Sequence, residues 1–129
     1  SSRTMKLQPD KFDVPSISAT GPGWVMIDGE KFTHHLIVGS RGELQRWDCQ
    51  GFEQLSAADF EPLAMLAPEL VIFGSGSRLR FPHPSLSASL LSRRIGLETM
   101  DTAAACRNYN ILAGEGRHVI AALLVASPL

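Results

Sequence analysis

The hydrophobic pattern of the second half of the chain predicts three strands separated by two helices. Continuous apolar runs occur at 70–73 and 119–125, and a shorter, part-polar run occupies 97–100. Apolar runs of this length, bounded by glycine or proline, are typical of strands covered on both faces. Helical spacing of apolar residues between these runs predicts helices over 85–94 and from 102 to about 114.

The helix that follows residue 100 has clear signals at its start and along its buried face. Asp101 or Thr102 can accept hydrogen bonds from the free N–H groups of its first turn. Ala105, Tyr109 and Leu112 recur at spacings of four and three, which places them on one face. This stretch therefore predicts a capped helix between two strands. The rest of the chain is expected to be organised around this unit of strand, helix and strand.

Glycines are expected to close both helices of the second half. Gly96 follows the helix over 85–94, whose inward residues are predicted to be Leu86, Leu90 and Leu91. Glycines 114 and 116 follow the second helix, and glycine readily takes the left-handed conformation that ends helices.

The order strand, helix, strand, helix, strand predicts parallel strands joined by right-handed crossovers. The strand at 97–100 is short and carries Glu98, so we expect it at the outside of the sheet. The strands at 70–73 and 118–125 are then neighbours, and the order of the three strands is 2-1-3.

The first half of the chain predicts an antiparallel meander. Strand-like runs at 24–27 and 30–38 flank the dipeptide Asp28-Gly29, a strong hairpin signal. A second turn at 39–42 leads to a third strand at 43–48, and an edge strand is predicted near 14–18. A helix is predicted to begin after Ser56, with Asp59 completing a near capping box, and to end at Pro68.

Composition and charge exclude some classes of function for this chain. The chain has 129 residues, 44% of them hydrophobic and 19% charged, with a net charge of −1. This balance gives no general attraction to nucleic acid or to an anionic membrane surface. No apolar run approaches the length of a membrane span, and no signal peptide is visible. We therefore expect a cytoplasmic protein with no direct membrane insertion and no nucleic-acid partner, in which Cys49 and Cys106 are reduced thiols rather than one disulfide.

The glycine-rich segment after the first buried strand is the first candidate site. Gly74, Ser75 and Gly76 end that strand, and Asp101 and Thr102 are expected at the same edge of the sheet. Ligands of open α/β sheets bind beyond the carboxyl ends of strands, where the strand order switches. The alternative is that the glycines only allow a tight turn, and it is preferred because the full GxGxxG fingerprint is missing.

A second polar group lies near the end of the same helix. Asn110 is predicted to bond backbone groups near the glycine turn, because most buried amides serve the backbone. Arg117 could pair with Glu115 or frame an anion site. Four other arginines could form a further patch that binds anions. Solvated surface charge is the preferred interpretation for these residues, which are Arg78, Arg80, Arg93 and Arg94.

Histidine placement argues against a metal site. His34 and His35 are adjacent in a predicted strand, so they would point to opposite faces and could not chelate together. His83 and His118 are scattered elsewhere. We therefore predict no metal site. The sequence also contains no catalytic signature, so we predict no catalytic residue and no cofactor.

Several separated motifs resemble one family. They are Pro68 to Gly76, Gly96 to Arg107, Tyr109 to Leu112 and Glu115 to Val119. Together they resemble a domain of unknown function shared by many bacterial proteins, mitochondrial complex I assembly factor 3 and a vertebrate protein associated with adipogenesis. The resemblance covers essentially residues 5–125. It implies a single three-layer α/β domain without an established enzyme activity, and for the mitochondrial member a role in assembling a membrane complex.

The pattern and the resemblance together predict an α/β fold with a single three-layer domain over residues 5–126. Its mixed sheet has a parallel βαβαβ C-terminal half and an antiparallel N-terminal meander. Residues 1–4 precede Met5 and are interpreted as an expression remnant.

The expected function is that of a non-enzymatic interaction module with an unidentified protein partner. By family analogy it is an assembly factor or chaperone for a membrane complex, and we expect a monomer or a weak homo-oligomer. The alternative is a small-molecule-binding or enzymatic domain that uses the crevice at Gly74 to Gly76.

Overall fold

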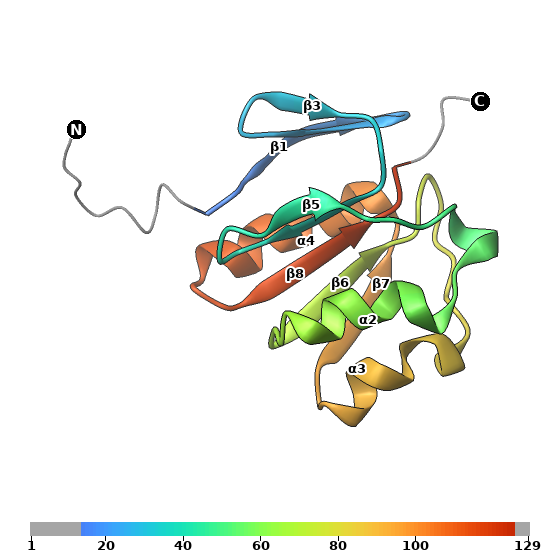
Figure 1. The fold of residues 1–129 in the computed structure, drawn as a ribbon. Helices are drawn as coiled ribbons and strands as arrows, with labels where there is room; N and C mark the ends of the chain where they lie inside the picture. Colours follow the sequence, from blue (N-terminus) through green and yellow to red (C-terminus); the bar gives the residue numbers. More distant parts are fainter. Residues whose placement is uncertain (1–13, 126–129) are drawn as a thin grey trace.

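The computed structural model describes residues 14–125. The predicted expression remnant at 1–4 and both predicted domain ends, residues 5 and 126, lie outside the described residues. Two β-sheets and three α-helices make up the described part of the chain (Figure 1).

A three-stranded antiparallel sheet comes first in the chain. Its order is β1-β2-β3, with bounds β1 (Ile17–Gly21), β2 (Trp24–Ile27) and β3 (Glu30–Phe32). The predicted Asp28-Gly29 turn joins β2 to β3, and both of its residues adopt positive φ angles, 50° and 87°. Such angles are characteristic of tight hairpin turns, so this hairpin prediction is confirmed.

The second sheet is mixed and has the order β5-β4-β8-β6-β7. Its strands are β4 (Leu36–Gly39), β5 (Leu44–Arg46), β6 (Leu70–Gly74), β7 (Gly96–Met100) and β8 (Val119–Leu123). Strand β6 pairs in parallel with both β7 and β8, whereas β4 is antiparallel to β8 and to β5. The predicted 2-1-3 order of the C-terminal strands and the α/β fold class are therefore confirmed.

Helices cover both faces of the five-stranded sheet and give the three layers. α4 (Thr102–Gly114) packs on one face together with the three-stranded sheet, whereas α2 (Ala57–Met65) and α3 (Ala88–Ser92) lie on the other (Figure 1). Two short 3₁₀ helices, η1 (Phe52–Gln54) and η2 (Pro84–Ser87), lie in the connections.

The pleat of β6 explains why its sequence is apolar without interruption. Leu70 and Ile72 pack into the core beneath α4, whereas Val71 and Phe73 pack into the core beneath α2 and α3. β8 divides its residues between the same two cores. A strand covered on both faces needs apolar side chains at every position, as the sequence predicted.

The predicted single strand over 30–38 is wrong. It divides at residues 33–35 into β3 and β4, which belong to different sheets. Leu36, Ile37 and Val38 are buried on both sides and pair with β8, whereas Glu30 and Lys31 are exposed. One straight strand could not serve both sheets, so residues 33–35 form the link between them.

The predicted helix over 85–94 is also only partly right. It consists of η2 followed by the short α3, and Leu91 is 77% exposed rather than inward. Arg94, with φ 59°, takes the left-handed conformation expected of Gly96, which instead begins β7. This early turn lets the Ile95 N–H bond the Leu90 carbonyl and places Ile95 in the core.

The other two helix starts follow their predicted caps. The Ser56 N–H donates to the Asp59 carboxylate at 2.9 Å before α2. Asp101 Oδ1 accepts from the Ala104 N–H at 2.9 Å before α4, so Asp101 is the N-cap. Gly116, with φ 82°, follows the end of α4.

Candidate functional site

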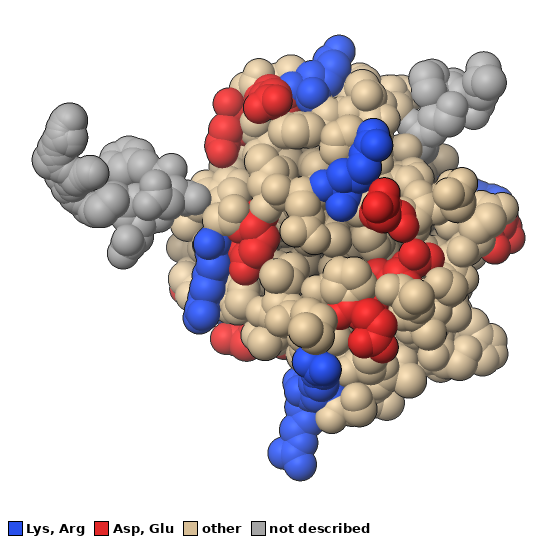
Figure 2. Space-filling view, in the orientation of Figure 1, with Lys and Arg blue, Asp and Glu red and all other residues tan. Residues whose placement is uncertain are grey.

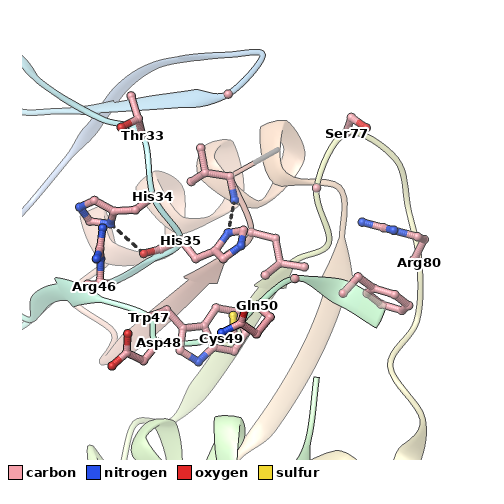
Figure 3. A pocket seen from close by; sticks show the side chains of 16 residues that line it. Thr33, His34, His35, Arg46, Trp47, Asp48, Cys49, Gln50, Ser77 and Arg80 are labelled. Carbon is pink, nitrogen blue, oxygen red and sulfur yellow. Dashed lines mark hydrogen bonds between the residues drawn. The ribbon is translucent and has the colours of Figure 1, made fainter. Parts of the chain in front are cut away.

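A cleft of about 820 Å³ opens where β6 and β8 end (Figure 3). Its walls come from five segments that are distant in the sequence: Gly23 between β1 and β2, the link at 33–35, residues 46–52 from the end of β5, the loop at 76–80 and residues 124–125 after β8. The cleft lies at the carboxyl ends of neighbouring parallel strands, which is the place where open α/β sheets bind ligands.

The turn that leaves β6 is held rigidly by hydrogen bonds. Ser75 is fully buried, and its Oγ donates to the Arg78 carbonyl at 2.7 Å and accepts from the Arg80 N–H at 3.0 Å. Gly76, with φ 103°, lines the cleft. Because the Ser75 hydroxyl is committed to backbone groups, its observed role is to shape the turn.

Gly74 and Thr102 bring the start of α4 close to the end of β6. A Cβ atom on Gly74 would lie 3.1 Å from the Thr102 Cα, so a larger residue there would require the start of the helix to move by a few tenths of an ångström. Thr102 Oγ1 accepts from the Gly76 N–H at 2.9 Å and donates to the Leu124 carbonyl at 2.7 Å. The structure thus brings these residues together with Ser75 and Asp101, as the sequence predicted.

Arg80 projects into the cleft from the loop after β6 (Figure 3). Its Nη2 donates to the Ser75 carbonyl at 2.8 Å, and its guanidinium carbon lies 4.4 Å from the centre of the Phe52 ring. The buried Nε has no acceptor among residues 14–125. The cleft lining includes Arg80 but not Arg78, Arg93 or Arg94, the other three arginines of the less favoured anion patch.

Two histidines line the opposite side of the cleft. His35 Nδ1 accepts a hydrogen bond from the Val125 N–H at 3.0 Å, so the proton of its neutral ring is on Nε2. Burial, with a smaller contribution from the neighbouring His34, lowers the pKa of His35 and favours that neutral form. His34 Nδ1 lies 2.9 Å from the His35 carbonyl. These histidines lie in the link between β3 and β4 rather than in a strand.

Trp47 and Cys49 lie beneath the polar groups. The Trp47 indole N–H donates to the Asp59 carbonyl at 2.9 Å, and its ring packs edge-on against Phe60 and Phe73. Burial raises the pKa of the Cys49 thiol to about 11, and the charges of Asp59 and Asp48 contribute in the same direction. The thiol is therefore neutral at physiological pH and is a poor nucleophile.

Two predicted site residues lie away from the cleft. Asn110 bonds both backbone groups of Ile17: its Oδ1 accepts from the N–H at 2.9 Å and its Nδ2 donates to the carbonyl at 2.7 Å. It therefore serves the backbone of β1 rather than the glycine turn. Arg117 pairs with Glu69 at 2.8 Å instead of with Glu115, and both partners are exposed.

Sequence reasoning missed most of the cleft lining. His35, Phe52 and Arg80 come from three separate connections, and only their packing brings them together. The sequence offered Arg80 only as one of four arginines, for which solvated surface charge was the preferred interpretation. Ligand binding by Gly74, Ser75, Gly76, Asp101 and Thr102 stays a prediction.

Charges of both signs are interspersed over the face shown in Figure 2. Such a mixture produces no broad field that would attract a polyanion to this face. Within residues 14–125, no three His, Cys, Asp or Glu side chains are grouped so that they could hold a metal ion. No helix in the same range is both long and apolar enough to cross a membrane.

The comparison with known proteins gives a family and a set of relatives. The family model described as a protein of unknown function (DUF498/DUF598) matches residues 17–124. The chain is 26% identical over 121 residues to NADH dehydrogenase (ubiquinone) 1 alpha subcomplex assembly factor 3 of Xenopus tropicalis. This match covers 92% of this chain and 66% of the relative. It is 34% identical over 110 residues to an uncharacterized protein of Rhodobacter capsulatus, covering 84% and 82%.

Solved structures agree with this result. A crystal structure of a protein from Bordetella parapertussis is 34% identical and superposes with a TM-score of 0.82, covering 87% of this chain and 96% of that one. The chain spans 44% to 66% of the length of the first assembly factors that it matches.

Proposed function

This chain belongs to the family of unknown function DUF498/DUF598, and from that membership we propose that it is a non-enzymatic interaction module. We propose further that it assists the assembly of a larger protein complex, by analogy a membrane complex. The observation that carries the proposal is the similarity to assembly factor 3, which extends over 92% of this chain. Because the similarity covers most of this chain, we carry the mode of protein binding over from that relative as an analogy.

The outer surface of the α2 and α3 layer offers a place for such a partner. Met65 and Leu91 are 69% and 77% exposed on these two helices. The helices pack together, and Arg93 Nη1 after α3 donates to the Ala64 carbonyl in α2 at 3.4 Å. Contiguous exposed apolar surface marks interaction sites, and we propose that Met65 and Leu91 belong to one such patch.

Crosslinking followed by affinity capture tests the proposal in cells that express the protein at its natural level. We expect one defined partner in stoichiometric amount with the wild-type chain. The double variant Met65→Lys, Leu91→Lys should lose that partner. Ile111→Lys is the matched control, because Ile111 is 60% exposed on α4, on the opposite face of the sheet. Capture of nothing above background by the wild type would reject the proposal.

The cleft supports a second candidate function, the binding of a small molecule. The observation that favours it is the position of the 820 Å³ cleft at the carboxyl ends of β6 and β8, with Gly76 in its wall. Its volume is in the range of small-molecule sites. A thermal-shift screen against a metabolite library tests it, because a ligand at a hundredfold excess over its Kd stabilises the native state by about 2.7 kcal/mol.

Variants of the cleft locate any binding that the screen finds. A thermal shift that disappears in Gly76→Val while the fold persists would place the ligand in the cleft. The absence of a shift from every compound class would reject this second function and leave the interaction module.

A further inference from the structure

We propose that the cleft binds an organic anion and that Arg80 receives its carboxylate group. This inference rests on the second candidate function, the binding of a small molecule, and gives the chemical class of the ligand. It is independent of the assembly role proposed for the outer helical surface.

Arg80 is held in place before any ligand arrives. Its backbone N–H donates to Ser75 Oγ at 3.0 Å, its Nη2 donates to the Ser75 carbonyl at 2.8 Å, and its guanidinium stacks over Phe52 at 4.4 Å. A flexible side chain fixed in this way loses little entropy when it binds, which favours affinity. A planar guanidinium also matches the geometry of a carboxylate.

Residues 14–125 do not supply a counter-charge for Arg80. In the described part of the chain, no carboxylate lies within 4.0 Å of its guanidinium, and the buried Nε lacks an acceptor. Buried donors in native proteins are nearly always satisfied, so the described part of the protein leaves this guanidinium incompletely compensated. An anion in the cleft would supply the missing counter-charge.

The rest of the lining suits the same class of ligand. Arg46 and His34 lie together on the wall opposite Arg80 (Figure 3), and Asp48 is the only carboxylate among the described residues of the lining. The cleft therefore has a positive balance, although the whole chain has a net charge of −1. Apolar and aromatic side chains, among them Phe52, would contact the organic part of the ligand.

Amide chemical shifts measured by NMR during titration test this proposal. Sodium benzoate is the probe, and benzamide is its neutral counterpart of nearly the same shape. We expect benzoate to shift the amides of Gly76, Ser77 and Arg80, and benzamide to bind at least about tenfold more weakly, because it lacks the charge. Equal binding of the two probes, or shifts confined to other surfaces, would overturn the proposal.

Variants identify the receiving group. Arg80→Gln should weaken benzoate binding at least about tenfold, whereas Arg80→Lys should keep part of the affinity through its charge. Arg78→Gln is the matched control, since it removes the same charge from the same loop at an exposed residue outside the cleft. Unchanged benzoate affinity in Arg80→Gln would overturn the assignment. If Arg80→Gln does not fold, the benzoate affinity of Arg80→Lys and the comparison of benzoate with benzamide on the wild type still test whether Arg80 receives the carboxylate.

A second experiment determines whether the carboxylate belongs to a peptide C-terminus or to a free organic acid. An acetylated Gly-Gly-Phe peptide with a free C-terminus is compared with the same peptide amidated. Tighter binding of the free-acid peptide than of both its amide and benzoate assigns the cleft to a peptide C-terminus. Tighter binding of benzoate than of the peptide assigns it to a free organic acid. Equal binding of the free-acid and amidated peptides, together with equal binding of benzoate and benzamide, would overturn the carboxylate proposal. Thermal shifts caused only by neutral compounds would reject the anion while leaving the small-molecule function intact.

Discussion

Thr102 Oγ1 accepts a hydrogen bond from the Gly76 N–H at 2.9 Å and donates one to the Leu124 carbonyl at 2.7 Å. One buried hydroxyl therefore joins the first turn of α4 to the chains that leave both parallel strands. Gly76 and Leu124 both line the cleft, so this hydroxyl fixes the separation of two of its walls. Asp101, the neighbouring residue, supplies the helix cap instead.

Thr102→Val should destabilise the protein by about 2 kcal/mol. Valine has nearly the same shape but leaves a buried N–H and a buried carbonyl without partners. Urea denaturation measures the loss, and amide exchange at Gly76 should become faster. Thr102→Ser keeps the hydroxyl and should retain most of the stability. Equal losses in the two variants would mean that the methyl group, rather than the hydrogen bonds, is responsible.

Asp101→Ala should cost about 1 kcal/mol, as the loss of a helix cap does. Asp101→Asn should cost less, because asparagine accepts the same hydrogen bond from the Ala104 N–H. Equilibrium denaturation of the two variants, with ligand and partner binding measured in parallel, separates a cap from a binding carboxylate. If Asp101→Asn removes binding while stability stays near wild type, the carboxylate is part of a site.

Gly76→Ala should destabilise the protein by about 1–3 kcal/mol, because its φ of 103° is strained for any residue with a Cβ. The new Cβ would also lie 3.0 Å from Arg80 Nη2. Gly114→Ala is the contrasting control: Gly114 is the last residue of α4, and a Cβ there meets nothing within 4 Å. That variant should be neutral or stabilise by up to about 1 kcal/mol. Thermal unfolding of both variants checks the contrast, and a loss at Gly114 similar to that at Gly76 would contradict it.

Local patterns were sufficient to predict the centre of the fold. The residues of β6 and β8 are apolar at every position because both faces are covered, and this property is visible in a single short run. The glycines after β6 and the cap at Asp101 are also local signals. The sheet order could therefore be inferred from the relative polarity of three strands.

The features that the sequence could not predict depend on contacts between residues that are far apart in the chain. Glu30 to Val38 looks continuous, and only the pairing of Ile37 with Ala122 of β8 assigns its second part to the larger sheet. The cleft has the same difficulty. Arg80 and Phe52 are 28 positions apart in the chain, and no short pattern indicates that the guanidinium stacks on that ring.

Cys49 should react slowly with iodoacetamide in the folded protein. Burial raises its pKa from 9.0 to about 11, so the thiolate fraction at pH 8 is about a hundredfold lower than in the unfolded chain. Burial likewise raises the pKa of Cys106 to about 12. Intact-mass measurement of labelling with and without urea checks this expectation. Rapid native labelling at Cys49 would show that the thiol is more accessible to solvent and more acidic than the structure indicates.

The pair formed by Glu43 and His118 should make stability fall in acid. Burial alone would raise the pKa of Glu43, but hydrogen bonds from His118 at 2.9 Å and from the Arg41 N–H at 3.0 Å outweigh it and hold the pKa below its usual value. A carboxyl group with a lowered pKa in the folded state stabilises the protein above its unfolded pKa of about 4.5. That contribution is lost as the pH falls through the lower folded-state pKa.

Glu43→Gln removes this titration while keeping a side chain of the same length. We expect the variant to be less stable than wild type at neutral pH, and its free energy of unfolding to decline less steeply below about pH 4.5. Urea denaturation over a series of pH values measures both effects. Glu61→Gln is the matched control, because Glu61 is exposed on α2. Parallel acid profiles for wild type and Glu43→Gln would show that this carboxylate does not control the acid sensitivity of the fold.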